Sequence, residues 1–148
     1  MRSIDLHWLS KKEKDITLPN LLYTEVEDCG ACYYPNKFFG NEVLINNKYY
    51  DCSNGLIVVN TNELYGDKNE VENALAHEWR HHCQFLRNIY LENKIRYNFN
   101  DSETYDENIV NYFLNDPTEM DALLFSLKVA PVEHCLEWQE LIKNRSKI

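Results

Sequence analysis

The chain has 148 residues, of which 44% are hydrophobic and 13% aromatic, enough for one folded domain with a core of its own. Its formal net charge of −9 argues against nucleic acid as a partner, because phosphate binding needs a basic surface. No apolar run approaches the about 18 residues that span a bilayer, and no secretory signal is recognisable, so we expect a cytoplasmic protein without a membrane partner.

The first 60 residues carry the periodicities of short β-strands. Residues 3–9 alternate apolar and polar side chains, which predicts a strand. Leu21 to Glu27 is a second candidate, and residues 42–46 and 48–52 predict a hairpin. Gly55–Asn60 contains four consecutive aliphatic residues, which is typical of a strand buried on both faces. These segments predict a small, mainly antiparallel sheet.

The five cysteines are scattered through the chain, and their odd number favours reduced thiols over a disulfide framework. Cys29-Gly30-Ala31-Cys32 forms a single C-x-x-C pair. This pair could be half of a zinc site with Cys52 as a third ligand, or it could be a redox pair. Because no second close pair exists, we interpret these residues as free, half-buried thiols.

The remainder of the chain predicts helices. Asp67 opens a capping box before a helix over about residues 68–91, whose apolar residues recur every three or four positions. Three further helices are expected, over Thr104–Asn115, from the N-cap Asp116 to Pro131, and over about residues 132–144. The prediction is therefore an α+β fold in a single domain of residues 1–148, sheet-rich over 1–60 and helical over 68–145.

The central predicted helix contains His77-Glu78-x-x-His81, an H-E-x-x-H sequence. In a helix, His77 and His81 lie one turn apart on the same face, where two neutral imidazoles can bind one Zn²⁺. Glu78 is rotated from them by one residue and can take a proton from a water that the metal activates. The alternative is an amphipathic helix whose polar residues happen to be histidine and glutamate.

Two histidines rarely complete a zinc site, so a third protein ligand is expected downstream. The candidate donors are the carboxylates and His82, Cys83, His134 and Cys135. We interpret His82 as a surface or supporting histidine and Cys83 as a core residue, because both are rotated away from the two histidines of the motif. No glycine follows Gly66, which excludes the metzincin pattern H-E-x-x-H-x-x-G-x-x-H.

The H-E-x-x-H sequence, followed at a distance by Pro117-Thr118-Glu119-Met120-Asp121-Ala122, resembles the gluzincin metallopeptidases. The likeness is to small single-domain members, namely the minigluzincins, the SprT-like proteins and the peptidases of phages and bacteria that act on repressors. It covers roughly residues 31–128. The resemblance implies a sheet, an active-site helix and a glutamate helix in that order.

The resemblance also implies roles for individual residues. The zinc ligands would be His77, His81 and Glu119. Glu78 would be the general base, and Asp121 or Asp116 could orient a ligand histidine through its other ring nitrogen. The alternative for Glu119 is a structural one, since it occupies the third position of a helix that Asp116 opens, where a capping box places a glutamate.

Two further features of the expected peptidase site have several candidates in this chain. Many gluzincins place a tyrosine or histidine downstream that stabilises the oxyanion, and the candidates are Tyr97, Tyr105, Tyr112 and His134. An extended peptide could also pair with a sheet edge, for which Gly55–Asn60 and Ala31–Tyr34 are the candidates.

The function predicted from these residues is zinc-dependent hydrolysis of peptide bonds in a protein or peptide substrate. The alternative is a non-catalytic, zinc-stabilised domain that binds or regulates a protein partner, which the small size and the ten tyrosines favour. A catalytic site keeps an open coordination position, whereas a structural site is closed by a fourth protein ligand. Action on DNA-bound proteins, as for SprT-like enzymes, would need a basic segment that this chain lacks.

Overall fold

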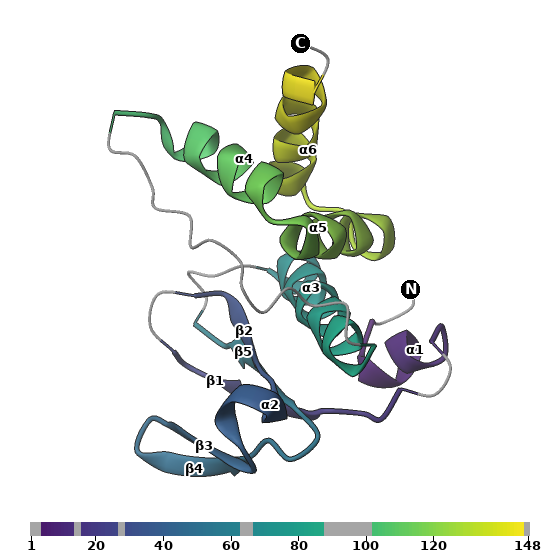
Figure 1. The fold of residues 1–148 in the computed structure, drawn as a ribbon, viewed down its shortest axis with the longest axis vertical. Coiled ribbons are helices and arrows are strands. Elements are labelled where there is room, and N and C mark those ends of the chain that lie inside the picture. Colours follow the sequence, from purple (N-terminus) through teal and green to yellow (C-terminus); the bar gives the residue numbers. More distant parts are fainter. Residues whose placement is uncertain (1–3, 14–15, 27–28, 63–66, 88–101, 147–148) are drawn as a thin grey trace.

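A computed structural model of the chain describes residues 4–13, 16–26, 29–62, 67–87 and 102–146. Within these residues the fold is α+β, with six helices and a small mixed sheet, and the predicted fold class is confirmed. The described helices include none that is both long and apolar enough to cross a membrane. Figure 1 shows the strands on one side of the longest helix and the C-terminal helices on the other.

The central sheet has three strands, in the order β1 (Asn20–Thr24), β5 (Leu56–Asn60) and β2 (Ala31–Tyr34). β5 pairs in parallel with β1 and antiparallel with β2, so the sheet is mixed. All five residues of β5 are buried, as its aliphatic run predicts for a strand covered on both faces. β2 lies at one edge of this sheet.

A hairpin of β3 (Glu42–Ile45) and β4 (Lys48–Asp51) covers one face of the sheet. Its turn residues, Asn46 and Asn47, have φ angles of 53° and 66°, a left-handed pair that matches the twist of an antiparallel hairpin. Along β3 every second residue is buried, which places its apolar side chains against β5. The predicted hairpin is confirmed.

The long helix α3 (Lys68–Leu86) covers the other face of the sheet. Asp67 caps it by accepting a hydrogen bond from the backbone N–H of Glu70, as the sequence predicts. The described helix ends at Leu86, short of the predicted residue 91, and residues 88–91 lie outside the described part of the chain. Its core-facing side chains, packed against Ile57 and Val59 of β5, are Leu75, Ala76, Trp79 and Cys83.

The predicted strand over residues 3–9 is wrong, because this segment contains the short helix α1 (Leu6–Ser10). The carboxylate of Asp5 accepts a hydrogen bond from the N–H of Trp8 and so caps the helix. A single turn buries Leu9 completely in the core with α3. A second short helix, α2 (Asn36–Phe39), begins directly after Pro35.

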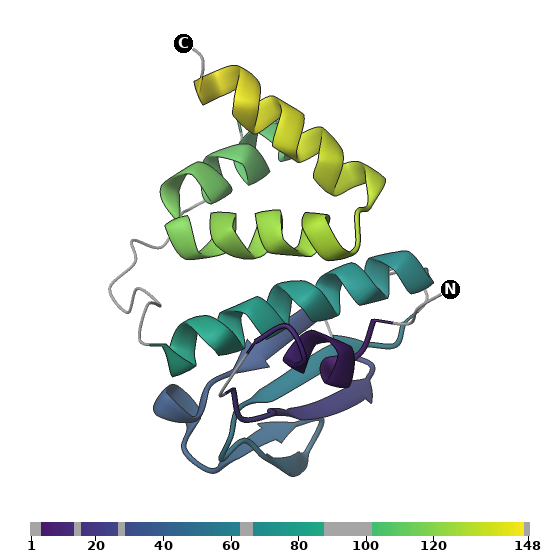
Figure 2. The ribbon, with the colours of Figure 1, turned by 90° about the vertical axis from the view of Figure 1, so that its right-hand side faces the viewer.

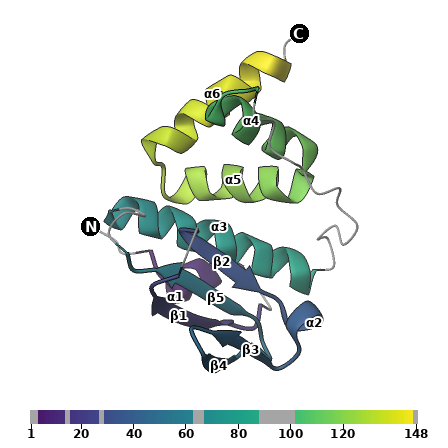
Figure 3. The ribbon, with the colours of Figure 1, turned by 90° about the vertical axis from the view of Figure 1, so that its left-hand side faces the viewer.

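Three helices complete the fold, α4 (Tyr105–Asn115), α5 (Pro117–Val129) and α6 (Glu133–Ser146). Thr104 caps α4, and Asp116 caps α5 as predicted. Figures 2 and 3 show α5 packed along the side of α3 that faces away from the sheet, with α4 and α6 beyond it. α3 is therefore enclosed between the sheet and α5. Its N-terminal part meets the end of α5, where Asn73 donates to the carbonyl of Ala130, and its later turns meet the first turns of α5.

Candidate metal centre

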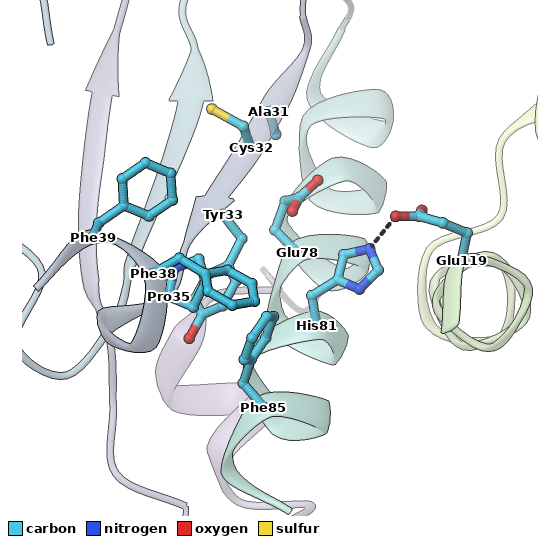
Figure 4. A pocket seen from close by; sticks show the side chains of 10 residues that line it. All are labelled: Ala31, Cys32, Tyr33, Pro35, Phe38, Phe39, Glu78, His81, Phe85 and Glu119. Atoms are coloured by element: carbon cyan, nitrogen blue, oxygen red, sulfur yellow. Dashed lines mark ion pairs between the residues drawn. The ribbon is translucent and has the colours of Figure 1, made fainter. Parts of the chain in front are cut away.

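His77 and His81 project from α3 toward α5 as a pair. Their spacing of four residues places the two rings on one helix face, where they meet edge to face with centroids 4.9 Å apart. Nε2 of His77 lies 3.0 Å from one carboxylate oxygen of Glu119, and Nε2 of His81 lies 3.0 Å from the other. Figure 4 shows the contact between His81 and Glu119 across the two helices. The structure thus brings together all three residues that the gluzincin resemblance implies as ligands.

Glu119 owes its position to the way α5 begins. The carboxylate of Asp116 accepts hydrogen bonds from the backbone N–H groups of Thr118 and Glu119, and Pro117 occupies the first helical position. In a capping box the Glu119 carboxylate would satisfy the backbone N–H of Asp116, but that N–H donates to the carbonyl of Phe113. The capping residue is therefore Asp116, and the Glu119 carboxylate faces the two histidines.

Gln84 fixes the orientation of His81. Its side-chain N–H₂ donates to the backbone carbonyl of Thr118 (3.0 Å) and to a carboxylate oxygen of Asp121 (2.9 Å). Its side-chain oxygen therefore faces Nδ1 of His81, 2.8 Å away, and accepts the proton of that nitrogen. With Nδ1 acting as the donor, Nε2 is the nitrogen that His81 presents to Glu119 or to a metal.

The expectation that Asp121 or Asp116 orients a ligand histidine needs correction, because the group on Nδ1 of His81 is Gln84. Asp121 acts on His81 through Gln84, because its carboxylate accepts a hydrogen bond from the Gln84 amide (2.9 Å). The same carboxylate accepts two hydrogen bonds from the guanidinium of Arg80 (2.8 and 3.2 Å). Asp116 is the N-cap of α5, and its carboxylate also accepts a hydrogen bond from the hydroxyl of Thr118. Sequence reasoning missed Gln84, although its position three residues after His81 on the same helix is a signal that could have found it.

The charges of the cluster are strongly coupled. Burial lowers the pKa of His81, but the hydrogen bond and the charge of Glu119 outweigh it and raise that pKa to about 9. Burial raises the pKa of Glu119, yet the hydrogen bonds from His77 and His81 outweigh it and hold that pKa well below its usual range. The carboxylate is thus ionised, the form in which a glutamate binds a metal.

The three side chains fit a zinc ion. Their ligand atoms all lie within 4.8 Å of one another. Two donor atoms on one tetrahedral Zn²⁺, each at about 2.0–2.1 Å from it, are about 3.3 Å apart. Each imidazole nitrogen lies 3.0 Å from a carboxylate oxygen of Glu119, close to that value, and the two nitrogens contact different oxygens of that carboxylate. Two imidazoles and one carboxylate are also a donor set that zinc uses in catalytic sites.

Glu78 lines a cavity of about 270 Å³ together with His81 and Glu119. The cavity lies between α3 and the edge strand β2, and Figure 4 shows the Glu78 carboxylate directed into it from the same helix as His81. The remaining walls are formed by Ala31, Cys32, Tyr33, Pro35, Phe38, Phe39 and Phe85. The carboxylate of Glu78, two residues of the His77–His81–Glu119 cluster and an apolar surface therefore share one cavity.

Of the two interpretations of His82, a surface or a supporting histidine, the first is wrong, because His82 is fully buried. Its Nε2 donates to the backbone carbonyl of Thr17 (2.6 Å), so its Nδ1 accepts from the hydroxyl of Tyr33 (2.7 Å). Burial lowers the pKa of His82, which favours this neutral form. Gly55, with a φ of 88°, permits the arrangement, because a Cβ there would lie 2.5 Å from the Tyr33 hydroxyl oxygen.

The other candidate residues stay apart from the cluster. Cys83 is buried in the core, as predicted. Among the described residues, the one group with the geometry of a metal site is the His77–His81–Glu119 cluster, so the structure lends no support to a zinc site at Cys29, Cys32 and Cys52. Three of the oxyanion candidates do not line the cavity as described, namely Tyr105, Tyr112 and His134. The fourth candidate, Tyr97, lies outside the described residues.

Comparison with protein-family models, with curated proteins and with solved structures gives no match for this chain.

Proposed function

We propose that this protein is a zinc-dependent peptidase. The observation that carries the proposal is the convergence of three metal-ligating side chains from two helices, with a fourth acidic side chain in the same cavity. His77 and His81 come from α3 and Glu119 from α5, and Glu78 is the additional carboxylate. This set supplies both a site for a Lewis acid and a general base, which together can hydrolyse an amide.

The roles follow from the contacts. His77, His81 and Glu119 would hold the metal, and Gln84 would keep Nε2 of His81 directed at it. When bound, Zn²⁺ lowers the pKa of a water ligand to about 7 and polarises a carbonyl. Glu78 takes one proton from the attacking water and delivers it to the amide nitrogen as the C–N bond breaks. The products are a carboxylic acid and an amine.

The position of β2 favours an extended peptide as substrate. β2 is hydrogen-bonded to β5 along one side, and within the described residues no strand pairs with its other side. Ala31, Cys32 and Tyr33 of this strand line the same cavity as Glu78. A peptide added along this edge would form backbone hydrogen bonds with β2 and pass the catalytic carboxylate.

A second candidate function is a zinc-stabilised domain that binds a protein partner, which three largely exposed tyrosines favour, namely Tyr23, Tyr49 and Tyr105. Structural zinc sites are almost always closed by four protein ligands. The described residues supply three. The coordination set thus favours catalysis.

The test is zinc content and peptide hydrolysis for the wild type and for Glu78→Gln. We expect close to one zinc per chain in both proteins, and a loss of hydrolysis of at least about 100-fold in the variant, the lower range for a general base. Glu72→Gln is the matched control, because Glu72 lies on the same helix and faces Lys68. Undiminished hydrolysis by Glu78→Gln, or a wild type that binds no zinc after reconstitution, would refute the proposal.

A further inference from the structure

The cavity beside the metal ligands has two chemically different ends. One end is formed by the carboxylates of Glu78 and Glu119 and the imidazole of His81, and the other by aromatic rings. The rings of Phe38 and Phe85 meet edge to face, with centroids 5.5 Å apart and planes at 88°. The ring of Tyr33 lies 5.7 Å from that of Phe85. An apolar surface is thus continuous with the catalytic end.

Local structure holds the aromatic end in place. Pro35 ends β2 and opens α2, and the side-chain amide of Asn36 donates to the carbonyl of Gly40 (2.8 Å), which closes the turn after α2. The ring of Phe39 packs edge to face against Tyr34 of β2 at 5.1 Å. Phe38 nevertheless remains 53% exposed, although it faces other aromatic rings. The site is therefore largely preformed, and it has apolar area left for a ligand to cover.

The volume indicates what kind of ligand fits. Pockets that enclose a whole drug-sized molecule typically measure about 300–1,000 Å³. This cavity measures about 270 Å³, part of which is the catalytic end. A neighbouring cavity of about 280 Å³ shares Tyr33, Pro35 and Phe85 with it, so the hollow continues beyond the rings. The shape suits one large side chain of a longer, extended chain better than a small molecule.

The direction of β2 indicates which substrate residue reaches the rings. Antiparallel pairing is slightly more stable per residue than parallel pairing. A peptide that runs antiparallel to β2 has its N-terminal part at the Pro35 end of the strand. The aromatic rings lie at that end, because α2 follows β2 directly. The residues that precede the scissile bond therefore approach the rings.

We propose that Phe38 and Phe85, with Tyr33 beside them, form a specificity site for a large apolar side chain of the substrate residue that precedes the scissile bond. This inference rests on the proposed peptidase activity. The preferred substrates are then peptides with leucine, methionine, phenylalanine or another bulky apolar residue on the carbonyl side of the cleaved bond. Small or charged residues at that position bind less well, because they leave the rings exposed to water.

The first experiment is a cleavage profile of the zinc-loaded wild type on a mixed peptide library, read by mass spectrometry. We expect large apolar residues to be enriched before the cleaved bond by about tenfold over alanine. Phe38→Lys should remove this enrichment and favour aspartate or glutamate at the same position. Tyr49→Ala is the matched control, because Tyr49 is largely exposed on β4, outside the cavity, and its loss should leave the profile unchanged.

The second experiment measures binding without turnover. Zinc-loaded Glu78→Gln is titrated by calorimetry with two peptides that differ only in phenylalanine or alanine at the position before the intended scissile bond. We expect about tenfold tighter binding of the phenylalanine peptide, and equal binding of the two peptides when Phe38→Lys is added. A purely structural role of Phe38 would change the stability of the protein but not the ratio of the two affinities.

The outcomes separate this inference from the proposed function. A wild type that cleaves peptides without the apolar preference, or with the preference on the amine side of the bond, overturns the specificity site and leaves the peptidase intact. The same holds if Phe38→Lys keeps the wild-type profile. If the wild type cleaves no peptide, the proposed function fails, and equal binding of both peptides by Glu78→Gln then overturns the specificity site as well.

Discussion

Replacing Gln84 by methionine tests whether the contacts behind His81 serve the metal site. The side chain of Gln84 is 1% exposed and bridges three partners, the imidazole of His81, the carbonyl of Thr118 and the carboxylate of Asp121. Methionine fills a similar volume but offers no N–H donor and only a weak acceptor. Gln84→Met therefore removes the hydrogen bonds without leaving a large cavity.

The magnitude follows from the groups left without a partner. The Nδ1–H of His81 and the carbonyl of Thr118 both belong to buried residues. A buried polar group that loses its partner costs about 1–3 kcal/mol, so the unfolding free energy should fall by about 2–6 kcal/mol. The zinc affinity should fall by about 10- to 100-fold, the usual effect of losing the group that orients a ligand histidine.

A second variant separates stability from metal affinity. Gln84→Glu keeps an oxygen that can accept from Nδ1 of His81, but places a carboxylate against Asp121 and the carbonyl of Thr118. It should therefore lose stability while keeping a zinc affinity close to that of the wild type. Competition with a chromophoric chelator gives the affinities, and urea unfolding of the metal-free proteins gives the stabilities. Gln139→Met, on α6, is the control for the substitution itself.

The reasoning fails if Gln84→Met binds zinc as tightly as the wild type. In that case the hydrogen bond to His81 would be a packing feature, and the orientation of the ring would be set by its neighbours in the core. Equal losses of affinity in Gln84→Met and Gln84→Glu would also contradict it, because the two variants differ in the acceptor offered to Nδ1.

Two further predictions concern the helix caps and the thiols. Asp116→Ala and Thr104→Ala each remove an N-cap and should each lower the unfolding free energy by about 0.5–2 kcal/mol. Only Asp116→Ala should also weaken zinc binding, because Asp116 opens the helix that carries Glu119. Equal zinc affinities in the two variants would show that the start of α5 does not position Glu119. Burial raises the pKa of the Cys135 thiol from 9.0 to about 12, so the folded state favours the neutral thiol. Its contribution to stability is present below pH 9 and is lost as the pH rises above it, and the stability difference between wild type and Cys135→Ala should shrink by about 1 kcal/mol from pH 8 to pH 10 in urea unfolding. A difference that stays constant over this range would contradict the burial argument.

The sequence predicts those parts of the fold whose signals are local. The caps at Asp67, Thr104 and Asp116 act within their own first turns, and the buried strand β5 is evident from consecutive aliphatic residues. The sequence predicts a strand in place of the helix at Leu6–Ser10 because residues 4–8 alternate in polarity, and the capping by Asp5 decides between the two. The parallel pairing of β1 with β5 is set by contacts between distant segments and has no local signal.

The same distinction applies to the site. The pair His77 and His81 follows from spacing alone, since a helix places residues four apart on one face. The contact of Glu119 with both rings depends on how α5 packs against α3, and the sequence alone leaves a capping role open for it. Phe38 could not be assigned from the sequence, because the turn that carries it is too short to show a periodicity.

The cluster is also hard to explain as a purely structural feature. Burying an ionised carboxylate beside two imidazoles costs several kcal/mol per ion in desolvation, and well-packed apolar side chains in its place are often as stable or more so. Here Gln84 and Asp121 form a second layer of hydrogen bonds that fixes one ring nitrogen of His81 and turns the other toward Glu119. These hydrogen bonds stabilise the packing of α3 against α5, and they also hold Nε2 of His81 in the orientation that a metal ligand needs. The supporting contacts, more than the H-E-x-x-H spacing itself, therefore favour a ligand-binding role for this cluster.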